Sequence, residues 1–555
     1  MTATDSEIAF PRLDARAVKE LERIGRVRDT TAGETLFAEG DRDICFFVVL
    51  EGSIEIVEHS SGEPIIVRLH EPGEFTGDVD TLSGRAVIVS GRVRDPGRVV
   101  ALSAAELRQA VNGMPQLSEI LLRAFLMRRA MLVEHGIQGI KIIGSRYSAD
   151  AHHLRDFANR NAIPFTWWDV ESDPQAESML CQFRIPTEET PVVLMRDGSL
   201  MRNPTVSALG RALGLDVNVQ ADHLYDLVVV GAGPAGLAAS VYAASEGLKV
   251  ITLDAVAAGG QAGTSSSIEN YLGFPAGISG RELTANALLQ AQKFGAQVSV
   301  PANVSTLSIE NGVRIVRLED GTAIRTRCVL VASGVEYRRL DVEGLEQYEG
   351  VGVYYAATEM EARLCHNAEV VVVGGGNSAG QAVMYLARHA RTVHIVIRGD
   401  DLGKSMSRYL VDRVQSLPNV KIHYGCSIDA MAGDCQLEKV QLKYADGGGR
   451  EISTPAVFMF IGAEAHTAWL KNCALLDKKG FVLTGDDVVT AQRTANPQYN
   501  PARTPFFLET SMPGVFAAGD VRSGSVKRVA SAVGEGAMAV SFVHAHLAAG
   551  TTVQS

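Results

Sequence analysis

A strand, a glycine-rich turn, a helix and a second strand follow one another twice in this chain, and this repeated unit restricts the fold more than any other feature. The first copy begins at Tyr225 and continues DLVVVGAGPAGLAASVYAASEGLKVITLD; the second begins at Glu369 and reads EVVVVGGGNSAGQAVMYLARHARTVHIVIR. A buried strand that leads through closely spaced glycines into a helix is typical of parallel α/β sheets that bind nucleotides. We therefore expect two nucleotide-binding domains.

In the first copy, Gly231, Gly233 and Gly236 have the spacing GxGxxG directly after the strand. The first glycine permits a tight turn, the second lets the backbone approach a diphosphate, and the third lets helix and strand pack closely. Asp254 ends the next strand, where an acid can accept hydrogen bonds from ribose hydroxyls. Because strand, helix and acid are all in place, a dinucleotide site is favoured over a turn without a ligand.

The second copy has Gly374, Gly376 and Ala379 at the same spacing, and Arg398 stands where the first copy has Asp254. A carboxylate there would repel a 2′-phosphate, whereas a guanidinium can pair with it. Arg398 therefore favours NADPH over NADH. The alternative is an ordinary solvated charge at the end of a strand.

Two segments within these units, GAGPAGLAASVYAASEGL and VVVGGGNSAGQA, join three motifs outside them: AGGQAGTSSSIENYLGFP, VLVASG and GVFAAGDV…KRVASAVGEG. In order and spacing they resemble low-molecular-weight thioredoxin reductases, from about Tyr225 to the C-terminus. The resemblance implies a homodimeric oxidoreductase with FAD and NADPH, and it places Asp520 on the ribityl chain. It implies that FAD is bound by Gly231, Gly233, Pro234, Ala235, Gly236, Asp254, Gly260, Gln261, Asn270, Gly519, Asp520, Lys527, Arg528 and Val529. For NADP it implies Gly374, Gly376, Asn377, Ser378, Ala379, Arg398 and Lys404.

The redox dithiol of that family is missing. In thioredoxin reductases a Cys-x-x-Cys pair lies just before the second glycine-rich unit, but here Ala356-Ala357-Thr358-Glu359 stands at that place, and none of the seven cysteines forms such a pair. Thiol–disulfide exchange needs a thiolate. We therefore expect hydride transfer from NADPH to the flavin to remain, because the cofactors carry that chemistry, and we assign no catalytic residue with certainty.

The electrons would then leave the flavin directly, for a quinone-like molecule, dioxygen, another redox protein or an unidentified acceptor. A ferredoxin– or flavodoxin–NADP reductase, a disulfide reductase that uses external thiols, and a non-catalytic flavin and nucleotide sensor are the alternatives. Glu359 would either tune flavin protonation or be an ordinary salt-bridged or solvated side chain. Cys365 is expected to be a core or surface thiol.

Strands alternate with helices between Gly139 and Leu215, which indicates a small α/β domain. This segment resembles a thioredoxin or glutaredoxin, and Thr190-Pro191-Val192 matches the loop where that family carries a cis-proline. Its dithiol would fall at Ser145-Arg146-Tyr147-Ser148, where serine cannot exchange disulfides. We expect a docking or spacer domain without redox activity, with Cys181 in its core.

The segment from Glu34 to Asp95 alternates apolar and polar residues in short runs broken by glycine, which predicts a β-roll or barrel. ETLFAEGD, FFVVLEGSIEI and PGEFTGDVDTLSGRA resemble the cyclic-nucleotide-binding domain of catabolite-activator-type proteins. The resemblance places Gly77 and Asp78 at the ribose and Arg85 at the cyclic phosphate. Binding of a cyclic nucleotide or other small ligand and a degenerate roll both remain open. The helix expected over 117–135 would pack against a partner subunit or a neighbouring domain.

The fold class is therefore multidomain: an N-terminal β-roll with helices, a small thioredoxin-like α/β domain, and two Rossmann-like domains with the NADP domain inserted in the FAD domain. The expected ranges are 1–136, 137–218, 222–339 and 465–555 for the two parts of the FAD domain, and 340–464 for the NADP domain. A net charge of -12 disfavours nucleic acid. The absence of an apolar run near ~18 residues disfavours a membrane span, and we expect a cytoplasmic protein without a metal.

Overall fold

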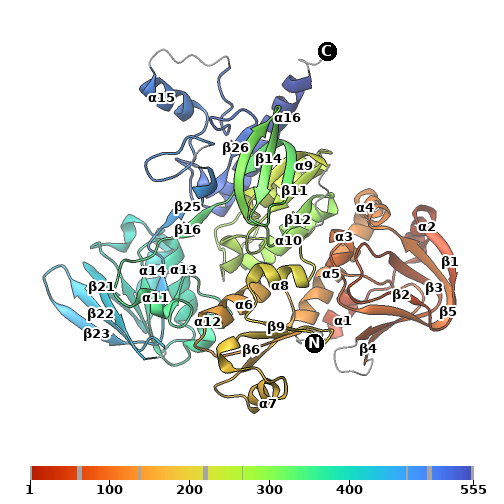
Figure 1. Ribbon diagram of the computed structural model, residues 1–555, viewed down its shortest axis with the longest axis horizontal. Helices are drawn as coiled ribbons and strands as arrows, with labels where there is room; N and C mark the ends of the chain where they lie inside the picture. The colour runs from red at the N-terminus through yellow and green to blue at the C-terminus, as the bar shows by residue number, and fades with distance from the viewer. Residues whose placement is uncertain are drawn as a thin grey trace.

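The computed structural model describes residues 3–58, 65–134, 139–216, 223–265, 267–434, 436–470, 473–496 and 503–551. Figure 1 shows an N-terminal β-roll at one end, a five-stranded sheet with a small antiparallel sheet at the other, and a large sheet with its helices between them. A small α/β unit lies below the centre and reaches toward all three. The expected domain boundaries near 136 and 218 lie outside the described residues.

The N-terminal unit is an antiparallel roll in the order β1-β5-β3-β4, with β2 paired to β5. Its strands are β1 (Arg26–Thr30), β2 (Thr35–Phe37), β3 (Phe46–Glu58), β4 (Ile65–His70) and β5 (Ser90–Leu102). Its helices are α1 (Ala3–Ala9), α2 (Ala15–Ile24), α3 (Val79–Ser83), α4 (Ala104–Gly113) and α5 (Pro115–Glu134). Helix α5 packs on the core of this roll through Leu121 and Phe125, and Leu289 of the neighbouring large domain joins the same cluster.

The second unit has a four-stranded sheet in the order β7-β6-β8-β9. Strands β6 (Ile140–Gly144) and β7 (Phe165–Asp169) are parallel, and β8 (Val192–Leu194) and β9 (Leu200–Arg202) are antiparallel to their neighbours. The helices are α6 (Ala149–Arg160), α7 (Pro174–Gln182) and α8 (Val206–Ala212). The Thr190–Pro191 peptide bond is cis.

The expectation for Cys181 is wrong. This thiol is exposed. It lies on α7, whose buried residues are Ala176 and Leu180. Because these two are four apart, they form the buried face of the helix, and the next position turns toward solvent.

The large sheet has seven strands in the order β12-β11-β10-β15-β14-β13, with β26 paired to β15. They are β10 (Leu224–Val230), β11 (Val250–Leu253), β12 (Gln297–Ser299), β13 (Val304–Glu310), β14 (Val313–Leu318), β15 (Ala323–Val331) and β26 (Val515–Ala517). Its main helices are α9 (Pro234–Ser245), α10 (Gly280–Lys293) and α16 (Val529–Thr551). Strand β10 pairs in parallel with β11 and β15, and β15 with β26, so the carboxyl ends of these strands meet at one edge.

A second parallel sheet, β17-β24-β18-β19-β20, lies in the sequence between β15 and β26. Its strands are β17 (Val353–Tyr354), β18 (Glu369–Val373), β19 (Thr392–Val396), β20 (Val420–His423) and β24 (Val457–Met459), and its main helices are α11 (Leu345–Tyr348), α12 (Glu359–Leu364), α13 (Asn377–Leu386) and α14 (Arg408–Ser416). An antiparallel sheet of β21 (Cys426–Ala432), β22 (Lys439–Tyr444) and β23 (Gly449–Ser453) packs on it.

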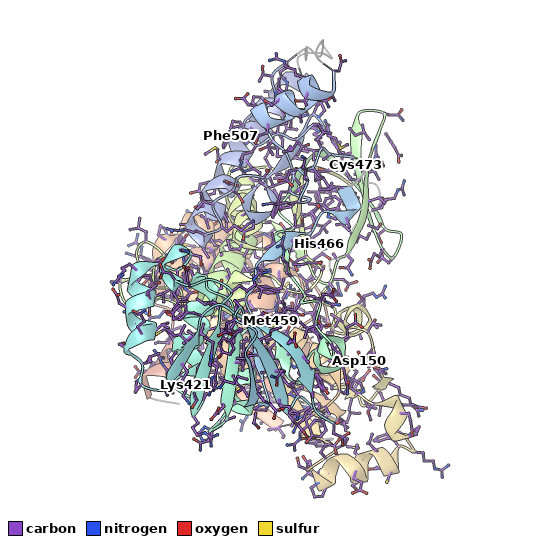
Figure 2. The ribbon with its side chains drawn as sticks, turned by 90° about the vertical axis from the view of Figure 1, so that its left-hand side faces the viewer. Asp150, Lys421, Met459, His466, Cys473 and Phe507 are labelled. Carbon is purple, nitrogen blue, oxygen red and sulfur yellow. The ribbon has the colours of Figure 1, made fainter. Side chains whose placement is uncertain are left out.

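The chain crosses between the two large sheets twice, and the crossings pair with each other as β16 (Val335–Tyr337) and β25 (Ala463–Ala465). Figure 2 shows the second crossing: His466 lies between Met459 of the five-stranded sheet and Cys473 beyond it. Helix α15 (Asp486–Ala495) follows before the chain returns to β26.

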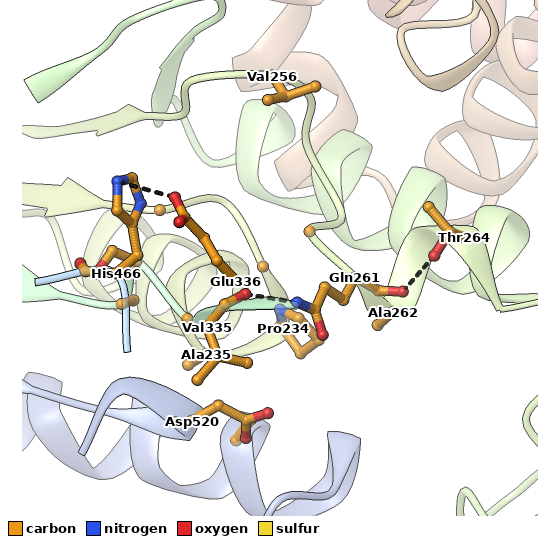
Figure 3. A pocket seen from close by; sticks show the side chains of 18 of the residues that line it. Pro234, Ala235, Val256, Gln261, Ala262, Thr264, Val335, Glu336, His466 and Asp520 are labelled. Atoms are coloured by element: carbon orange, nitrogen blue, oxygen red, sulfur yellow. Dashed lines mark hydrogen bonds and ion pairs between the residues drawn. The ribbon is translucent and has the colours of Figure 1, made fainter. Parts of the chain in front are cut away.

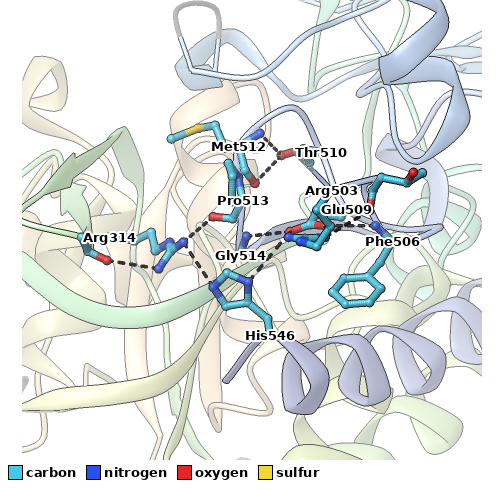
Figure 4. Close-up of polar contacts among 11 residues, drawn as sticks. Arg314, Arg503, Phe506, Glu509, Thr510, Met512, Pro513, Gly514 and His546 are labelled. Atoms are coloured by element: carbon cyan, nitrogen blue, oxygen red, sulfur yellow. Dashed lines mark hydrogen bonds and ion pairs between the residues drawn. The ribbon is translucent and has the colours of Figure 1, made fainter. Parts of the chain in front are cut away.

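An ion pair between a buried carboxylate and a partly exposed arginine fixes the return to β26. Glu509 is 1% exposed, and it accepts two hydrogen bonds from Arg503, at 2.6 and 2.7 Å, and one from the backbone N–H of Gly514, at 2.9 Å. Arg314 of β14 donates to the Pro513 carbonyl and contacts His546 of α16 (Figure 4). The network therefore ties β14, the turn before β26 and α16 together, just upstream of the site described next.

Candidate active site

A cavity of about 900 Å³ lies where the two large sheets face each other. This volume is within the ~300–1,000 Å³ of ordinary cofactor pockets. The lining comes from the glycine turn after β10, the loop after β11, the first crossing, the start of α13 and the start of α16. It includes Gly231, Gly233, Pro234, Ala235, Asp254, Gly260, Gln261, Asn270, Tyr337, Tyr355, Ala356, Ala357, Asn377, Ser378, Gly519, Asp520, Lys527, Arg528 and Val529.

The first glycine turn has the shape that a diphosphate site requires. Gly231 has φ +107°, and a Cβ there would lie 2.2 Å from the Ala332 carbonyl oxygen. A Cβ on Gly236 would lie 1.9 Å from the Gly231 carbonyl oxygen, so this glycine serves helix–strand packing and does not line the cavity. Helix α9 begins after Gly233 without a side-chain cap. Its first N–H groups are therefore available to an anion.

The acid after β11 is held in place at the cavity edge. The Asp254 carboxylate accepts hydrogen bonds from the backbone N–H groups of Ala232 at 2.8 Å, Val256 at 2.9 Å and Ala257 at 3.0 Å. A carboxylate has about four acceptor sites, so this arrangement orients the group and leaves capacity for a ribose hydroxyl. The residues at this end of the cavity fit the adenosine part of a dinucleotide.

The opposite wall carries Asp520. Its neighbour Gly519 donates its N–H to Glu535 at 2.7 Å, and Lys527 donates to the Asp520 carbonyl oxygen at 2.9 Å. Burial raises the pKa of Asp520 and lowers the pKa of Lys527. Helix α16 begins at Val529, and its first residues line the cavity, so its N-terminal end favours negative charge there.

Figure 3 shows how the loop after β11 is joined to the first crossing. Gln261 donates through Nε2 to the Val335 carbonyl oxygen at 2.5 Å, and Thr264 donates to the Gln261 carbonyl at 2.9 Å. Glu336 and His466, from the two crossings, form an ion pair at 3.4 Å on the cavity wall. The motifs gave no indication of this pair, because it depends on how the two crossings meet.

The segment Ala356-Ala357-Thr358-Glu359, where the resemblance predicts the dithiol, meets the cavity through its first two residues. Ala356 and Ala357 line it, and no cysteine is found among its described lining residues. Cys365 is fully buried in the neighbouring core, and burial raises its pKa to about 12. Glu359 is the first residue of α12, but its side chain lies outside the described residues.

Two tyrosines absent from the sequence predictions lie beside this segment. The rings of Tyr337 and Tyr355 stack with centroids 5.9 Å apart and an interplanar angle of 16°. Burial raises the pKa of Tyr337 to about 12. Both line the cavity, so an aromatic wall stands next to Ala356.

The second glycine turn opens toward the same cavity. Gly374 has φ +131°, and a Cβ there would lie 2.2 Å from the Phe460 carbonyl oxygen, whereas a Cβ on Gly376 would meet nothing within 4 Å. Helix α13 begins after Gly376 without a side-chain cap, and its first residues Asn377 and Ser378 line the cavity. Ala379 is buried beneath the turn. A second diphosphate can therefore approach this helix end.

The remaining NADP candidates lie away from the cavity. Arg398 follows β19 and is exposed, and its side chain forms no ion pair with a described residue. Lys404 is also exposed and pairs with Asp400 at 2.5 Å. A free guanidinium beside the second nucleotide turn fits a 2′-phosphate.

In the roll, the three ligand candidates surround α3. Asp78 caps this helix, and its carboxylate accepts from the Asp80 N–H at 2.9 Å. Burial beside Asp80 raises the pKa of Asp78 to about 6. The Gly77 carbonyl accepts from Arg128 at 2.6 Å. The Nε atom of Arg85 is buried without a hydrogen-bond partner among the described residues.

Two more arginines reach this cluster. Arg129 of α5 forms an ion pair with Asp80 at 2.5 Å. Arg196, from the turn after β8 of the second unit, has its pKa lowered by burial, and Glu39 and Arg129 are among the charges that act on it. Arg196 of the second unit therefore lies within electrostatic range of the charged residues around α3.

Comparison with known proteins finds family matches for the two large domains and for the N-terminal roll. The sequence pattern of the family described as pyridine nucleotide-disulphide oxidoreductase matches residues 225–536. The chain belongs to this family. A second pattern, the cyclic nucleotide-binding domain, matches residues 27–113, so this oxidoreductase carries that domain at its N-terminal side.

Similar proteins include two thioredoxin reductases. That of Treponema pallidum is 33% identical over 316 residues, which cover 57% of this oxidoreductase and 94% of the relative. The crystal structure of the Lactococcus lactis enzyme is 26% identical, with a TM-score of 0.52, and covers 58% of this chain and 99% of that one. A 34.2 kDa protein of the Clostridium pasteurianum rubredoxin operon is 30% identical, over 57% of this chain and 94% of that protein.

The oxidoreductase is therefore a thioredoxin-reductase-like flavoprotein, a type that uses FAD and NADPH. The two uncapped helix starts, the open approach at Gly376 and the glycine pair at the first turn fit these two cofactors. Within the described residues, no helix is both long and apolar enough to span a bilayer.

Proposed function

We propose that this flavoprotein oxidises NADPH and passes the electrons from FAD directly to an acceptor, without a protein dithiol. The observation that supports the proposal is that Ala356 and Ala357, which stand where the family resemblance predicts cysteines, line the cavity. FAD would supply the chemistry of hydride acceptance and electron release. The chain would bind its diphosphate on the N-terminus of α9 and orient its ribose through Asp254.

We assign FAD to the fourteen residues that the family resemblance implies for it, the first of which is Gly231 and the last Val529. We assign NADPH to the turn from Gly374 to Ala379 together with Arg398 and Lys404. The domains would be the ranges 1–136, 137–218, 222–339, 340–464 and 465–555, with the NADP domain inserted in the FAD domain and a homodimer as the assembly. The sheet order of the second unit supports a thioredoxin-like fold. Ser148 caps α6 where that fold would carry its dithiol, so this domain would be a docking module.

The test is anaerobic mixing of the yellow protein with NADPH, followed by addition of acceptors. Bleaching of the flavin at 450 nm, followed by reoxidation with quinones, ferredoxin or dioxygen but not with thioredoxin or insulin disulfides, is the expected result. Failure to bleach would favour a non-catalytic sensor. Turnover of ferredoxin or flavodoxin alone would specify an NADP reductase of that type, and turnover of disulfides with external thiols would contradict the proposal.

The charged residues around α3, which include Asp78, Arg85 and Arg129, support a regulatory ligand site in the roll. Arg85 has an unsatisfied buried Nε atom, which an anionic ligand would satisfy. Arg42 of the roll also pairs with Asp216 at the end of the second unit, at 3.1 Å. We propose that a cyclic nucleotide or another small phosphate-bearing ligand alters NADPH oxidation. Titration of cyclic AMP and cyclic GMP into the wild-type protein and into Arg85→Ala would show a change in turnover only in the former.

A further inference from the structure

Arg160 lines the flavin cavity although it belongs to the second unit and not to either nucleotide-binding domain. It is the last residue of α6. Its Nη2 lies 3.4 Å from the Gly260 carbonyl oxygen, and its Nη1 lies 3.6 Å from the Asp156 carboxylate one turn earlier. The side chain is 24% exposed, so most of its surface is covered by protein.

Arg160 reaches the part of the cavity where Gly233 of the first glycine turn lies against Gly260 of the loop after β11. A Cβ built on Gly260 would lie 3.0 Å from the Gly233 Cα, which means that the two backbones almost touch there. Gly233 is the residue from which α9 begins. The guanidinium therefore stands beside the helix end that offers its N–H groups to a diphosphate.

The other cationic side chains of the cavity, among its described lining residues, come from the crossing and from the start of α16. Arg339 pairs with Glu349 at 3.1 Å, and Lys527 donates to the Asp520 carbonyl. A diphosphate bound at the start of α9 would place roughly two negative charges beside the Arg160 guanidinium. The carboxylate that pairs with Arg160, Asp156, lies at the long distance of 3.6 Å. Guanidinium and phosphate geometries match closely.

The packing of the second unit fixes the position of Arg160. The next residue, Asn161, donates to the Val256 carbonyl oxygen at 2.9 Å, on the same loop that contains Gly260. Leu209 of α8 shares one apolar cluster with Val298 and Val300 of the large domain. Because this interface is apolar and closed, α6 cannot shift its end without exposing the cluster to water.

We propose that Arg160 binds the diphosphate of FAD, so that the second unit completes the flavin site. The inference rests on the proposed function, because it assumes that the first glycine turn holds FAD. It gives the thioredoxin-like unit a role in cofactor binding that needs no cysteine. Arg160 would bind the cofactor directly but take no part in electron transfer.

The experiment measures binding of FAD and of riboflavin to the flavin-free full-length protein, by quenching of flavin fluorescence. A charge-assisted hydrogen bond of this partly exposed kind corresponds to about tenfold in affinity. Arg160→Met should weaken FAD binding about tenfold and leave riboflavin binding unchanged, because riboflavin has no phosphate. Arg160→Lys should recover part of the loss, and the affinity of wild type for FAD should fall more steeply with NaCl than that of Arg160→Met.

The matched control is Arg211→Met on α8. Arg211 also belongs to the second unit and faces Asp320 of the large domain at 4.0 Å, but it does not line the cavity. It should bind FAD like wild type. Equal FAD affinity in Arg160→Met and wild type would overturn the inference, and so would a parallel loss of FAD and riboflavin, which would indicate a damaged interface. Wild-type protein that binds no FAD would instead overturn the proposed function.

Discussion

The ion pair between Arg522 and Glu535 gives the sharpest test of how the cavity wall is held. Glu535 accepts from Arg522 Nη2 at 2.5 Å and Nε at 3.2 Å, and from the N–H of Gly519 at 2.7 Å. The two side chains are 11% and 13% exposed. We predict that Glu535→Gln destabilises the FAD domain by about 3 kcal/mol, the lower end of the range for breaking a buried pair, because glutamine keeps one acceptor oxygen.

This free energy can be converted into a melting temperature. A unit of roughly 150–250 residues loses about 2–4 °C per kcal/mol, so the expected fall is about 6–12 °C. Release of flavin fluorescence on heating, and a urea titration followed by the same signal, measure it. Flavin content should fall as well, because Glu535 fixes Gly519 next to Asp520.

Two variants make the prediction refutable. Arg522→Met combined with Glu535→Gln removes both charges and should be less destabilised than Glu535→Gln alone. Glu310→Gln breaks the exposed pair with Arg317, whose side chains are 54% and 46% exposed, and should cost at most ~1 kcal/mol. A fall in melting temperature of less than about 2 °C for Glu535→Gln, which corresponds to under about 1 kcal/mol, would refute the account, and so would a strictly additive double variant.

Three further predictions concern the nucleotide turns and the network before β26. Gly236→Ala should abolish FAD binding, measured as flavin content, because its Cβ would lie 1.9 Å from a backbone oxygen. Gly376→Ala should fold normally, because its Cβ would meet nothing within 4 Å, and should weaken NADPH binding, measured by titration. Arg398→Ala should lower the preference for NADPH over NADH about tenfold in kcat/KM, since it removes one charge-assisted contact to a 2′-phosphate. Arg503 and backbone N–H donors lower the pKa of Glu509 although burial opposes this shift. Glu509 therefore contributes stability above its unfolded pKa, and this stability is lost as the pH falls through its folded pKa. The melting temperature of Glu509→Gln should accordingly fall less below pH ~4.5 than that of wild type.

The glycine turns and the acid after β11 could be predicted because their requirements are local. Gly231 needs a positive φ and Gly236 needs contact with backbone, and both needs are set within one strand–turn–helix unit. Asp254 follows the same logic, because its carboxylate binds N–H groups of its own loop and of the turn. The contact of Gly231 with the Ala332 carbonyl adds a distant constraint to a choice that the turn already makes locally.

The residues that the motifs missed depend on contacts between distant segments. Arg160 lies 100 positions from Gly260, whose carbonyl it approaches. Tyr337 stacks on Tyr355 only because the first crossing returns past the segment before α12. Hydrophobic periodicity and motif spacing do not predict such contacts, because these contacts depend on how separate apolar faces pack together. The exposure of Cys181 was missed for a similar reason, because its neighbour Leu180 takes the buried position.

The second unit lies against both nucleotide-binding domains at once, and this has a thermodynamic consequence. At one end of α6, His152 packs on Tyr354 of β17 with ring centroids 5.5 Å apart. At the other end, Asn161 donates a hydrogen bond to the Val256 carbonyl in the loop after β11. Arg196 of the same unit faces the charged cluster of the roll. A ligand that reorders this cluster therefore acts on a body that also contacts the flavin loop. Because coupling free energies are reciprocal, any factor by which such a ligand changes the affinity for FAD must equal the factor by which FAD changes the affinity for the ligand. A ligand that changes the rate of NADPH oxidation without changing the affinity for FAD would mean that the roll acts on turnover by a route other than FAD binding.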